Sequence, residues 1–268
     1  MSPARGLLIV NADDWGGFRE GTDAIERCFA AGAISSTTAM VHMADSARAA
    51  ELARERARPT GLHLNLTQPF DAPDVPEAVR ERQRRLCAHF RRLGARRWTR
   101  SPDPRVHRLL ADAIAEQLEA HRALYARDPT HLDSHHHVHL CPDVYRSRAF
   151  PRELPVRQTL SFAPARSRAP GGVPPRARLT HLLGTLKHAL LARRFHTTES
   201  FWCASELSPG SRSLPIADIA AHAAQHTVEV MVHPSFEAEL DVLLAEPWLA
   251  ALRGASLGSY GDFAALSR

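Results

Sequence analysis

The stretch that decides the fold spans residues 6–17 and reads GLLIVNADDWGG. Its first half is a continuous apolar run, typical of a strand buried on both faces of a parallel sheet. Asp13 and Asp14 end the run, and the glycines at 16 and 17 let the chain bend. Adjacent strand residues point to opposite faces, so both carboxylates can serve one pocket only if the strand ends here. One could then bind a cation while the other acts as a general base, unless both simply build a turn or a helix cap.

Outward from this stretch, short apolar strands alternate with amphipathic helices, the pattern of βα units and a parallel sheet. Further strands are predicted at residues 34–41, 60–66, 131–140, 156–162 and 228–232, and helices at 22–31, 44–56 and 106–126. The chain has 268 residues, a length that suits one α/β barrel. We therefore predict a single domain over residues 1–268.

Two stretches interrupt the alternation of strands and helices. Residues 68–105 carry nine arginines between Arg80 and Arg100, and we predict an inserted helical segment or lid there. Residues 163–178 are rich in Pro, Gly and Arg and are predicted to form a loop. Strand patterns continue beyond both, so neither stretch is interpreted as a linker between domains.

The composition limits the classes of partner. The formal net charge is +5, and Lys187 is the only lysine among the basic residues. Spread along the chain, this charge does not indicate a nucleic-acid partner, although guanidinium groups suit anionic substrates. The four cysteines include no C-x-x-C pair, and we expect them to be reduced and mostly buried. The apolar run at 7–10 is too short for an export signal and no 18-residue apolar stretch exists, so we expect a cytoplasmic protein without membrane insertion.

Histidines lie in or directly after three other predicted strands, and sites in parallel α/β proteins form at the carboxyl edge of the sheet. His63 shares a strand face with Gly61 and Asn65. His233 ends the strand at 228–232, on the same face as Glu229. Residues 131–139 contain five histidines, and if this segment is extended, one face carries Asp133, His135, His137 and His139.

Together these residues supply the donors of a hydrolytic metal site. One carboxylate and two imidazoles can hold a divalent cation and leave positions open for water and substrate. The remaining carboxylate and histidine could act as general base and general acid in amide hydrolysis. Three alternatives stay open: a non-haem iron oxygenase with the same ligand types, a metal phosphoesterase that uses the Arg-rich segment, and a sugar- or metal-binding protein without catalysis.

The same motifs resemble the YdjC-like carbohydrate deacetylase family, which includes chitooligosaccharide deacetylases. The resemblance rests on LIVNADDWG at 8–16, ISSTTAMV at 34–41, GLHLNLT at 61–67, THLDSHHHVH at 130–139, EVMVHPSF at 229–236 and LGSY at 257–260. It implies an α/β fold, a distorted seven-stranded (β/α) barrel similar to a TIM barrel. It also implies a hydrolase that removes the N-acetyl group from an amino sugar or short oligosaccharide and releases acetate.

The resemblance further implies roles for individual residues. One divalent metal ion, Mg²⁺ in this family with Zn²⁺ as the alternative, is expected on Asp14, His63 and His135. Asp13 is expected to be the general base and His233 the general acid, and the resemblance is compatible with a homodimer. Candidates for contact with the sugar are Trp15, Asn65, His137, Arg157 and Phe236, whereas Trp202 is expected in the core. Residues 68–105 match the family poorly, which leaves the identity of the sugar open.

Overall fold

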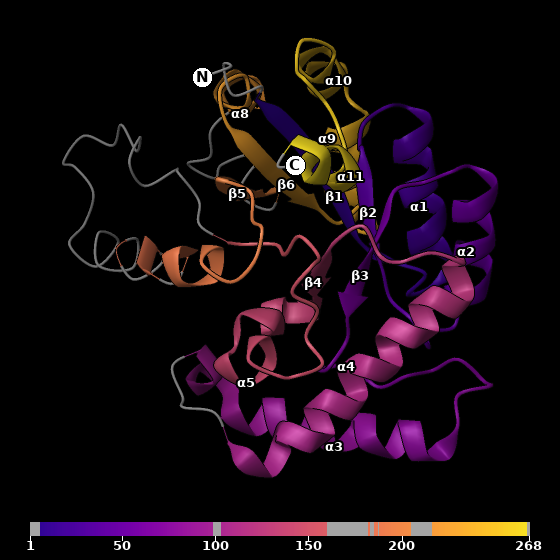
Figure 1. The fold of residues 1–268 in the computed structure, drawn as a ribbon. Coiled ribbons are helices and arrows are strands. Elements are labelled where there is room, and N and C mark those ends of the chain that lie inside the picture. Colours follow the sequence, from indigo (N-terminus) through magenta and orange to yellow (C-terminus); the bar gives the residue numbers. More distant parts are fainter. Residues whose placement is uncertain are drawn as a thin grey trace. The chain divides into compact units, whose positions relative to one another are not determined.

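In the computed structural model, which describes residues 6–98, 103–159, 182, 185–186, 188–204 and 216–266, the opening stretch forms strand β1 (Leu7–Trp15). Six described strands form one sheet in the order β4-β3-β2-β1-β6-β5 (Figure 1). The other five are β2 (Ser36–Ala39), β3 (Thr60–Leu64), β4 (Leu132–Ser134), β5 (Ser200–Cys203) and β6 (Thr227–Val232). The α/β class with a parallel sheet is therefore confirmed.

The chain divides into two compact units. The terminal unit comprises Met1–Asp13, Asp23–Ser36 and Pro155–Arg268, and the central unit comprises Asp14–Thr22 and Thr37–Leu154. The boundary cuts β1 after Asp13, in the middle of the carboxylate pair.

In the terminal unit β1 pairs in parallel with β6, from Leu7 opposite Thr227 to Ala12 opposite Val232. β5 pairs in parallel with the other edge of β6. The helices of this unit include most of α1 (Arg19–Ala30), α8 (Ile216–Ala223), α9 (Glu237–Leu244), α10 (Glu246–Arg253) and α11 (Tyr260–Leu266). Buried Trp248 of α10 ties this helix to the segment after α1, because its indole N–H donates to the Ala33 carbonyl at 3.0 Å.

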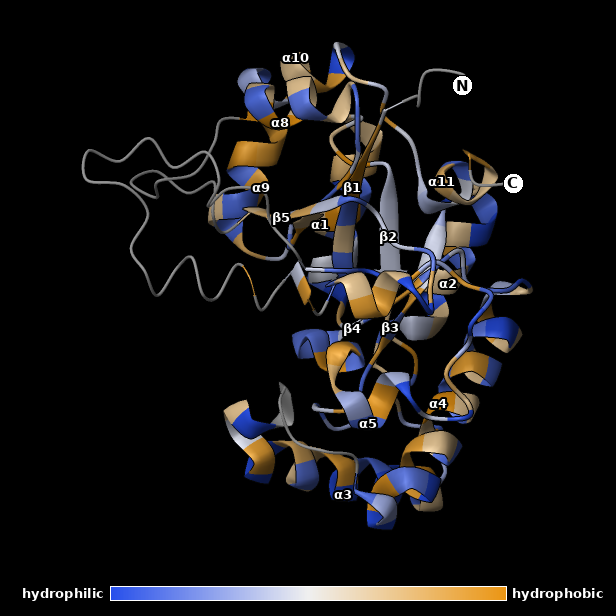
Figure 2. Cartoon of the chain, turned by 60° about the vertical axis from the view of Figure 1, so that its left-hand side comes forward, coloured by the Kyte–Doolittle hydropathy of each residue, from blue (hydrophilic) through white to orange (hydrophobic). Residues whose placement is uncertain are grey.

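In the central unit β2 pairs in parallel with β3, and β3 with β4. Its helices are α2 (Ser46–Glu55), α3 (Glu77–Leu93), α4 (Pro104–Tyr125) and α5 (Pro142–Tyr145), with 3₁₀ turns η1 (Gly94–Trp98) and η2 (His135–Leu140). The long helix α4 packs on α2 and α3. Figure 2 shows α3 and α4 banded with hydrophilic and hydrophobic residues, as expected for helices with one buried face.

Most predicted elements lie within a few residues of the observed ones, and the differences are local. β5 was not predicted, because the four-residue strand SFWC shows no clear alternation. The strand predicted at 156–162 does not form at residues 156–159, where Val156 makes one backbone bond to the His196 carbonyl, and residues 160–162 lie outside the described ones. The loop predicted at 163–178 also lies outside them. The seventh strand, closure into a barrel and the single-domain organisation stay predictions.

The environment of the cysteines agrees with the composition. None of the four is in a disulfide; Cys28, Cys87 and Cys141 are buried, and Cys203 is half-buried. Burial raises the pKa of the Cys28 thiol to about 12. Trp202 is 1% exposed, which confirms its place in the core. Within the described residues, every helix is too short or too polar to cross a membrane.

Candidate metal and catalytic site

The two carboxylates at the end of β1 are separated by a change of backbone handedness. Asp14 has φ of 66°, in the left-handed region, and Gly16 follows with φ of 82°. Aspartate tolerates this conformation better than most residues do. The left-handed residue interrupts the strict alternation of the strand, and the Gly17 N–H then donates to the Asp14 carbonyl at 3.0 Å to close the turn. The bend expected at 16–17 therefore begins at Asp14 itself.

Asp14, His63 and His135 come together in the central unit. Their donor atoms all lie within 4.8 Å of one another. Asp14 Oδ1 is 3.3 Å from His63 Nε2 and 3.4 Å from His135 Nδ1. His63 is 2% exposed, whereas Asp14 and His135 are each 21% exposed, so one side of the cluster is accessible to solvent. A carboxylate and two imidazoles at this spacing fit a single divalent cation.

A buried carboxylate fixes the orientation of the His63 ring. His63 and Asp133 are register partners on β3 and β4, and His63 Nδ1 lies 2.7 Å from Asp133 Oδ1. The Thr38 hydroxyl at the end of β2 donates to the other oxygen, Asp133 Oδ2, at 3.0 Å. A proton held on Nδ1 by Asp133 leaves the Nε2 lone pair directed at the Asp14 carboxylate, which is the arrangement of a metal-ligating histidine.

The terminal unit holds a second cluster, centred on Asp13. The Arg157 guanidinium binds both carboxylate oxygens of Asp13, at 2.7 Å each. Its Nε and Nη2 lie 2.8 and 2.7 Å from Glu229 Oε1, and the Tyr260 hydroxyl donates to Glu229 Oε2. All four side chains are at most 3% exposed. Two carboxylates around one guanidinium leave one net negative charge, and each charged group has a partner, as buried ions require.

His233 lies beside this cluster. Its Nε2 is 3.9 Å from Asp13 Oδ2, and its side chain is 22% exposed. The His233 backbone N–H donates to Glu239 Oε2 at 2.7 Å, which fixes the chain just after β6. Burial raises the pKa of Glu239, with a smaller rise from the negative charge of Asp13. The expected acid and base therefore lie close together in one unit.

The five candidates for sugar contact have very different surroundings. Trp15 is fully buried and its indole N–H donates to the Ala49 carbonyl at 3.2 Å, so its ring presents no face to a ligand in this structure. Arg157 is equally buried and contacts Asp13 rather than solvent. Phe236 is 61% exposed, with its ring 5.7 Å from that of His233. Phe236 is thus the aromatic candidate whose exposure suits stacking on a sugar.

Asn65 and His137 complete the set of candidates. Asn65 is buried and builds a turn: its Oδ1 accepts from the backbone N–H groups of Thr67 and Gln68, and its Nδ2 donates to the Gln68 carbonyl. His137 is half-buried in η2 with φ of 55°. Both lie close in sequence to the candidate metal ligands His63 and His135, and sugar contact by either stays a prediction.

The histidine-rich segment does not form one extended face. β4 stops at Ser134, and His136 and His137 both have φ of 55°. Ser134 causes the turn, because its Oγ accepts the His139 N–H at 2.8 Å and lies 2.7 Å from His139 Nδ1. Among the four residues expected on one face, only His135 lies in the cluster with Asp14 and His63. Asp133 contacts the Nδ1 atom of His63 instead.

Two glutamines near the site carried no signal in the sequence. Gln117 of α4 accepts the Asn65 N–H and donates to the Asn65 carbonyl, at 2.9 and 2.8 Å. Gln83 of α3, within the Arg-rich segment, donates to the carbonyls of Asn65 and Gln68. Both helices are thereby fastened to the loop that follows His63. Isolated glutamines in amphipathic helices look like solvated residues, so only the fold reveals this role.

Comparison with known proteins identifies the family of the chain. The family model of YdjC-like proteins matches residues 7–256. The chain belongs to the YdjC-like family. Chitooligosaccharide deacetylases of Yersinia enterocolitica (serotype O:8, biotype 1B) and Yersinia pestis (strain Pestoides F) are 38% and 40% identical over 162 and 159 residues. Each match covers 56% of this YdjC-like chain and 58% of the relative.

A solved structure shows the same fold. A protein of Enterococcus faecalis V583, described as a candidate for cellobiose-phosphate cleavage, superposes with a TM-score of 0.67. The match covers 96% of this YdjC-like chain and 98% of the other, at 19% identity. At this identity the match supports the fold alone.

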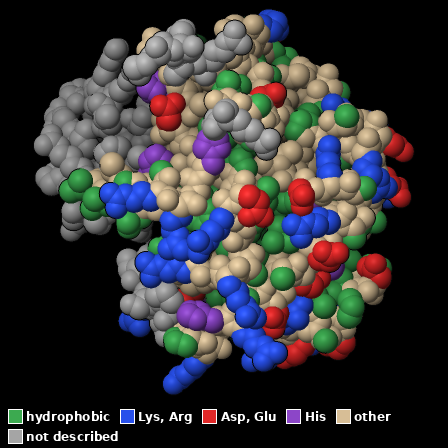
Figure 3. All heavy atoms as spheres, viewed as in Figure 1, with side chains coloured by type: hydrophobic (Ala, Val, Ile, Leu, Met, Phe, Trp, Pro, Cys, Tyr) green, Lys and Arg blue, Asp and Glu red, His purple; other side chains and the backbone are tan. Residues whose placement is uncertain are grey.

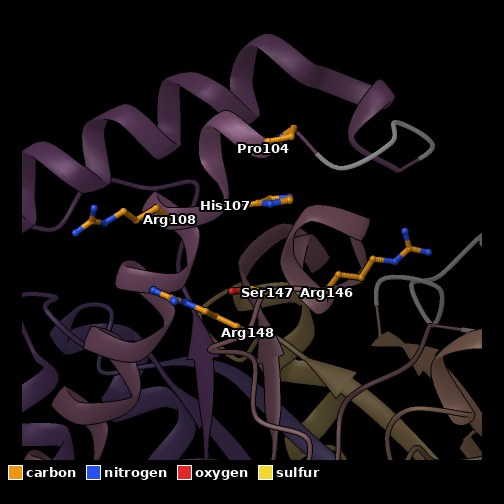
Figure 4. Close-up of a pocket in the computed structure, with 6 residues that line it drawn as sticks. All are labelled: Pro104, His107, Arg108, Arg146, Ser147 and Arg148. Carbon is orange, nitrogen blue, oxygen red and sulfur yellow. The ribbon is translucent and has the colours of Figure 1, made fainter.

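The central unit also carries a basic pocket of about 540 Å³. Its lining residues are Pro104, His107, Arg108, Arg146, Ser147 and Arg148. Figure 3 shows basic side chains gathered over the region of α4 and α5. In Figure 4, however, the guanidinium groups of Arg108 and Arg146 point to opposite sides, with His107 and Ser147 between them. The charges thus spread over the pocket instead of converging on one small anion.

Proposed function

We propose that this YdjC-like chain is a metal-dependent hydrolase that removes the N-acetyl group from an N-acetylated amino sugar or a short oligosaccharide. The observation that carries the proposal is the cluster of Asp14, His63 and His135, with Asp133 behind His63 and the acid–base candidate Asp13 next to Asp14 in the chain. A protein that only binds a metal would need the cluster of Asp14, His63 and His135 but not the acid–base candidate Asp13.

The chemistry of the donors bears on the metal. When bound, a divalent cation would supply Lewis acidity that activates water and polarises the acetamide carbonyl. Family membership favours Mg²⁺. Two imidazoles among three donors suit Zn²⁺ better, because Mg²⁺ prefers oxygen ligands. We therefore propose one divalent ion at Asp14, His63 and His135. A competition experiment between Mg²⁺ and Zn²⁺ would identify the ion.

The residues of the terminal unit would move the protons. Asp13 would take a proton from the attacking water, with its carboxylate plane held by the two bonds from Arg157. His233 would donate a proton to the nitrogen of the leaving amine, so that the sugar departs as a neutral amine and acetate is released. The 3.9 Å between His233 Nε2 and Asp13 Oδ2 lets both act on one amide.

Sequence similarity is the basis for the class of substrate. The two Yersinia relatives are named chitooligosaccharide deacetylases, and the aligned part is 58% of their length. We extend that class to this chain as oligosaccharides of N-acetylated amino sugars. Exposed Phe236 beside His233 is the proposed stacking surface for a sugar ring. A lid role for residues 68–105, a homodimer and a cytoplasmic location remain proposals from the sequence.

The decisive experiment measures acetate released from N-acetylglucosamine and its short β-linked oligomers. The purified protein is tested after EDTA treatment and after addition of Mg²⁺, Zn²⁺ or Co²⁺. We expect metal-dependent acetate from at least one substrate, and none from Asp14→Asn. The exposed carboxylate variant Asp241→Asn serves as the matched control and should retain activity. If the metal-loaded protein releases no acetate but hydrolyses an aryl phosphate, the phosphoesterase alternative replaces the proposal.

A further inference from the structure

The chain of buried hydrogen bonds behind Asp13 ends on a tyrosine that lies far away in the sequence. Tyr260 opens α11, and its hydroxyl donates to Glu229 Oε2 on β6. Glu229 Oε1 receives the Nε–H of Arg157, whose two terminal nitrogens bind Asp13. Tyr260 and Glu229 are both 0% exposed, so water does not compete for these bonds. We propose that the Tyr260 hydroxyl is a positioning group that orients the Asp13 carboxylate through Glu229 and Arg157.

The geometry gives each member one task. Arg157 donates from two edges of its planar guanidinium, one to Asp13 and the other to Glu229. Rotation of the guanidinium therefore needs both carboxylates to move. Glu229 can orient the Arg157 guanidinium only if its own carboxylate plane is fixed. The Tyr260 hydroxyl fixes this plane because it donates to Oε2, while Arg157 donates to Oε1. The Asn11 side chain also donates to Asp13 Oδ1, at 3.0 Å.

The ring of Tyr260 is held independently of its hydroxyl. It packs with Leu7, Ile9 and Phe263 in a buried apolar cluster, and lies edge-on to Phe263 at 6.0 Å between ring centroids. Tyr260→Phe should therefore keep the ring and the position of α11 while it removes the bond to Glu229. This separation makes the hydroxyl testable without disturbing the fold.

The inference rests on the proposed function for its kinetic test. We expect Tyr260→Phe to lower kcat about tenfold or more with KM changed less than about twofold, because misorientation affects the chemical step. Metal content should equal that of the wild type. Tyr125→Phe, which removes another fully buried hydroxyl, is the matched control and should leave kcat unchanged. In a Glu229→Gln background, the additional loss from Tyr260→Phe should nearly vanish, since both changes break the same connection. Equal multiplicative losses in the two backgrounds would refute action through Glu229.

A second readout does not depend on activity. The Nε–H of Arg157, identified by its absence in Arg157→Lys, should exchange slowly with solvent in the wild type, and Tyr260→Phe should accelerate this exchange about tenfold or more. Unchanged exchange would overturn the proposal. If the wild type releases no acetate from any substrate, the proposed function fails, whereas the exchange measurement still decides the role of Tyr260.

Discussion

The carboxylate behind His63 gives the sharpest quantitative prediction. Asp133→Asn keeps the shape of the side chain but removes the charge that faces His63 Nδ1 at 2.7 Å. The amide can still accept one hydrogen bond, so the ring has a partner but loses the fixed tautomer and part of its basicity. Loss of such a supporting group typically lowers metal affinity 10–100-fold. We therefore expect about 1.4–2.7 kcal/mol less binding free energy for Zn²⁺.

The assay is a chelator competition for Zn²⁺ with the metal-free protein. Asp143→Asn provides the matched control, because Asp143 is another buried carboxylate of the central unit and accepts the Asp103 N–H at 2.6 Å. Its affinity should stay within about twofold of the wild type. Asp14→Asn should lose far more than Asp133→Asn, since it removes a donor. Wild-type affinity in Asp133→Asn, together with lost binding in Asp14→Asn, would refute the reasoning about His63.

Three further predictions address the base, a buried histidine and the thiols. Asp13→Asn should lower turnover roughly 10²–10⁴-fold with Zn²⁺ affinity retained, and near-normal turnover would exclude Asp13 as the base. Burial, aided by the charge of Arg127, lowers the pKa of His121 from 6.5 to about 4, so the unfolded state takes up the proton first and stability falls as the pH drops through this window. As the pH falls from about 7 to about 5, His121 should lower the free energy of unfolding of the metal-free protein by about 2 kcal/mol, measured by urea unfolding. An equal decrease in His121→Phe would contradict this. Iodoacetamide should label half-buried Cys203 before Cys28, and labelling of Cys28 in the folded protein at the same rate would show that its thiol is not protected.

Local patterns were enough for much of the fold. The apolar runs of β1 and β6 and the long amphipathic pattern of α4 predicted these elements to within a few residues. Backbone turns set by single side chains were harder. Nothing in HLDSHHHVH shows that Ser134 will bind His139 and stop the strand, so a shared extended face was a natural expectation. The four residues of β5 are too few to display a period.

Site residues could be predicted where a sequence motif contains the residue types that the chemistry needs. They could not be predicted where the register between two strands brings residues together. Asp14, His63 and His135 come together, as the family resemblance implied. Asp133 supports His63 because parallel pairing of β3 and β4 makes them register partners, a fact that neither segment contains alone. Arg157 was a candidate for contact with the sugar, and only the fold shows that its guanidinium binds two buried carboxylates of the same chain.

The left-handed residue at the end of β1 has a consequence for how this sequence can vary. Asp13 belongs to one compact unit and Asp14 to the other, and a single peptide bond joins them. Loops elsewhere in a protein accept insertions at small cost in free energy. Between residues 13 and 14 even one added residue would lengthen the chain that joins the proposed base to the proposed metal ligand by about 3.8 Å. We therefore expect no insertions between residues 13 and 14, even where the loops of either unit vary in length.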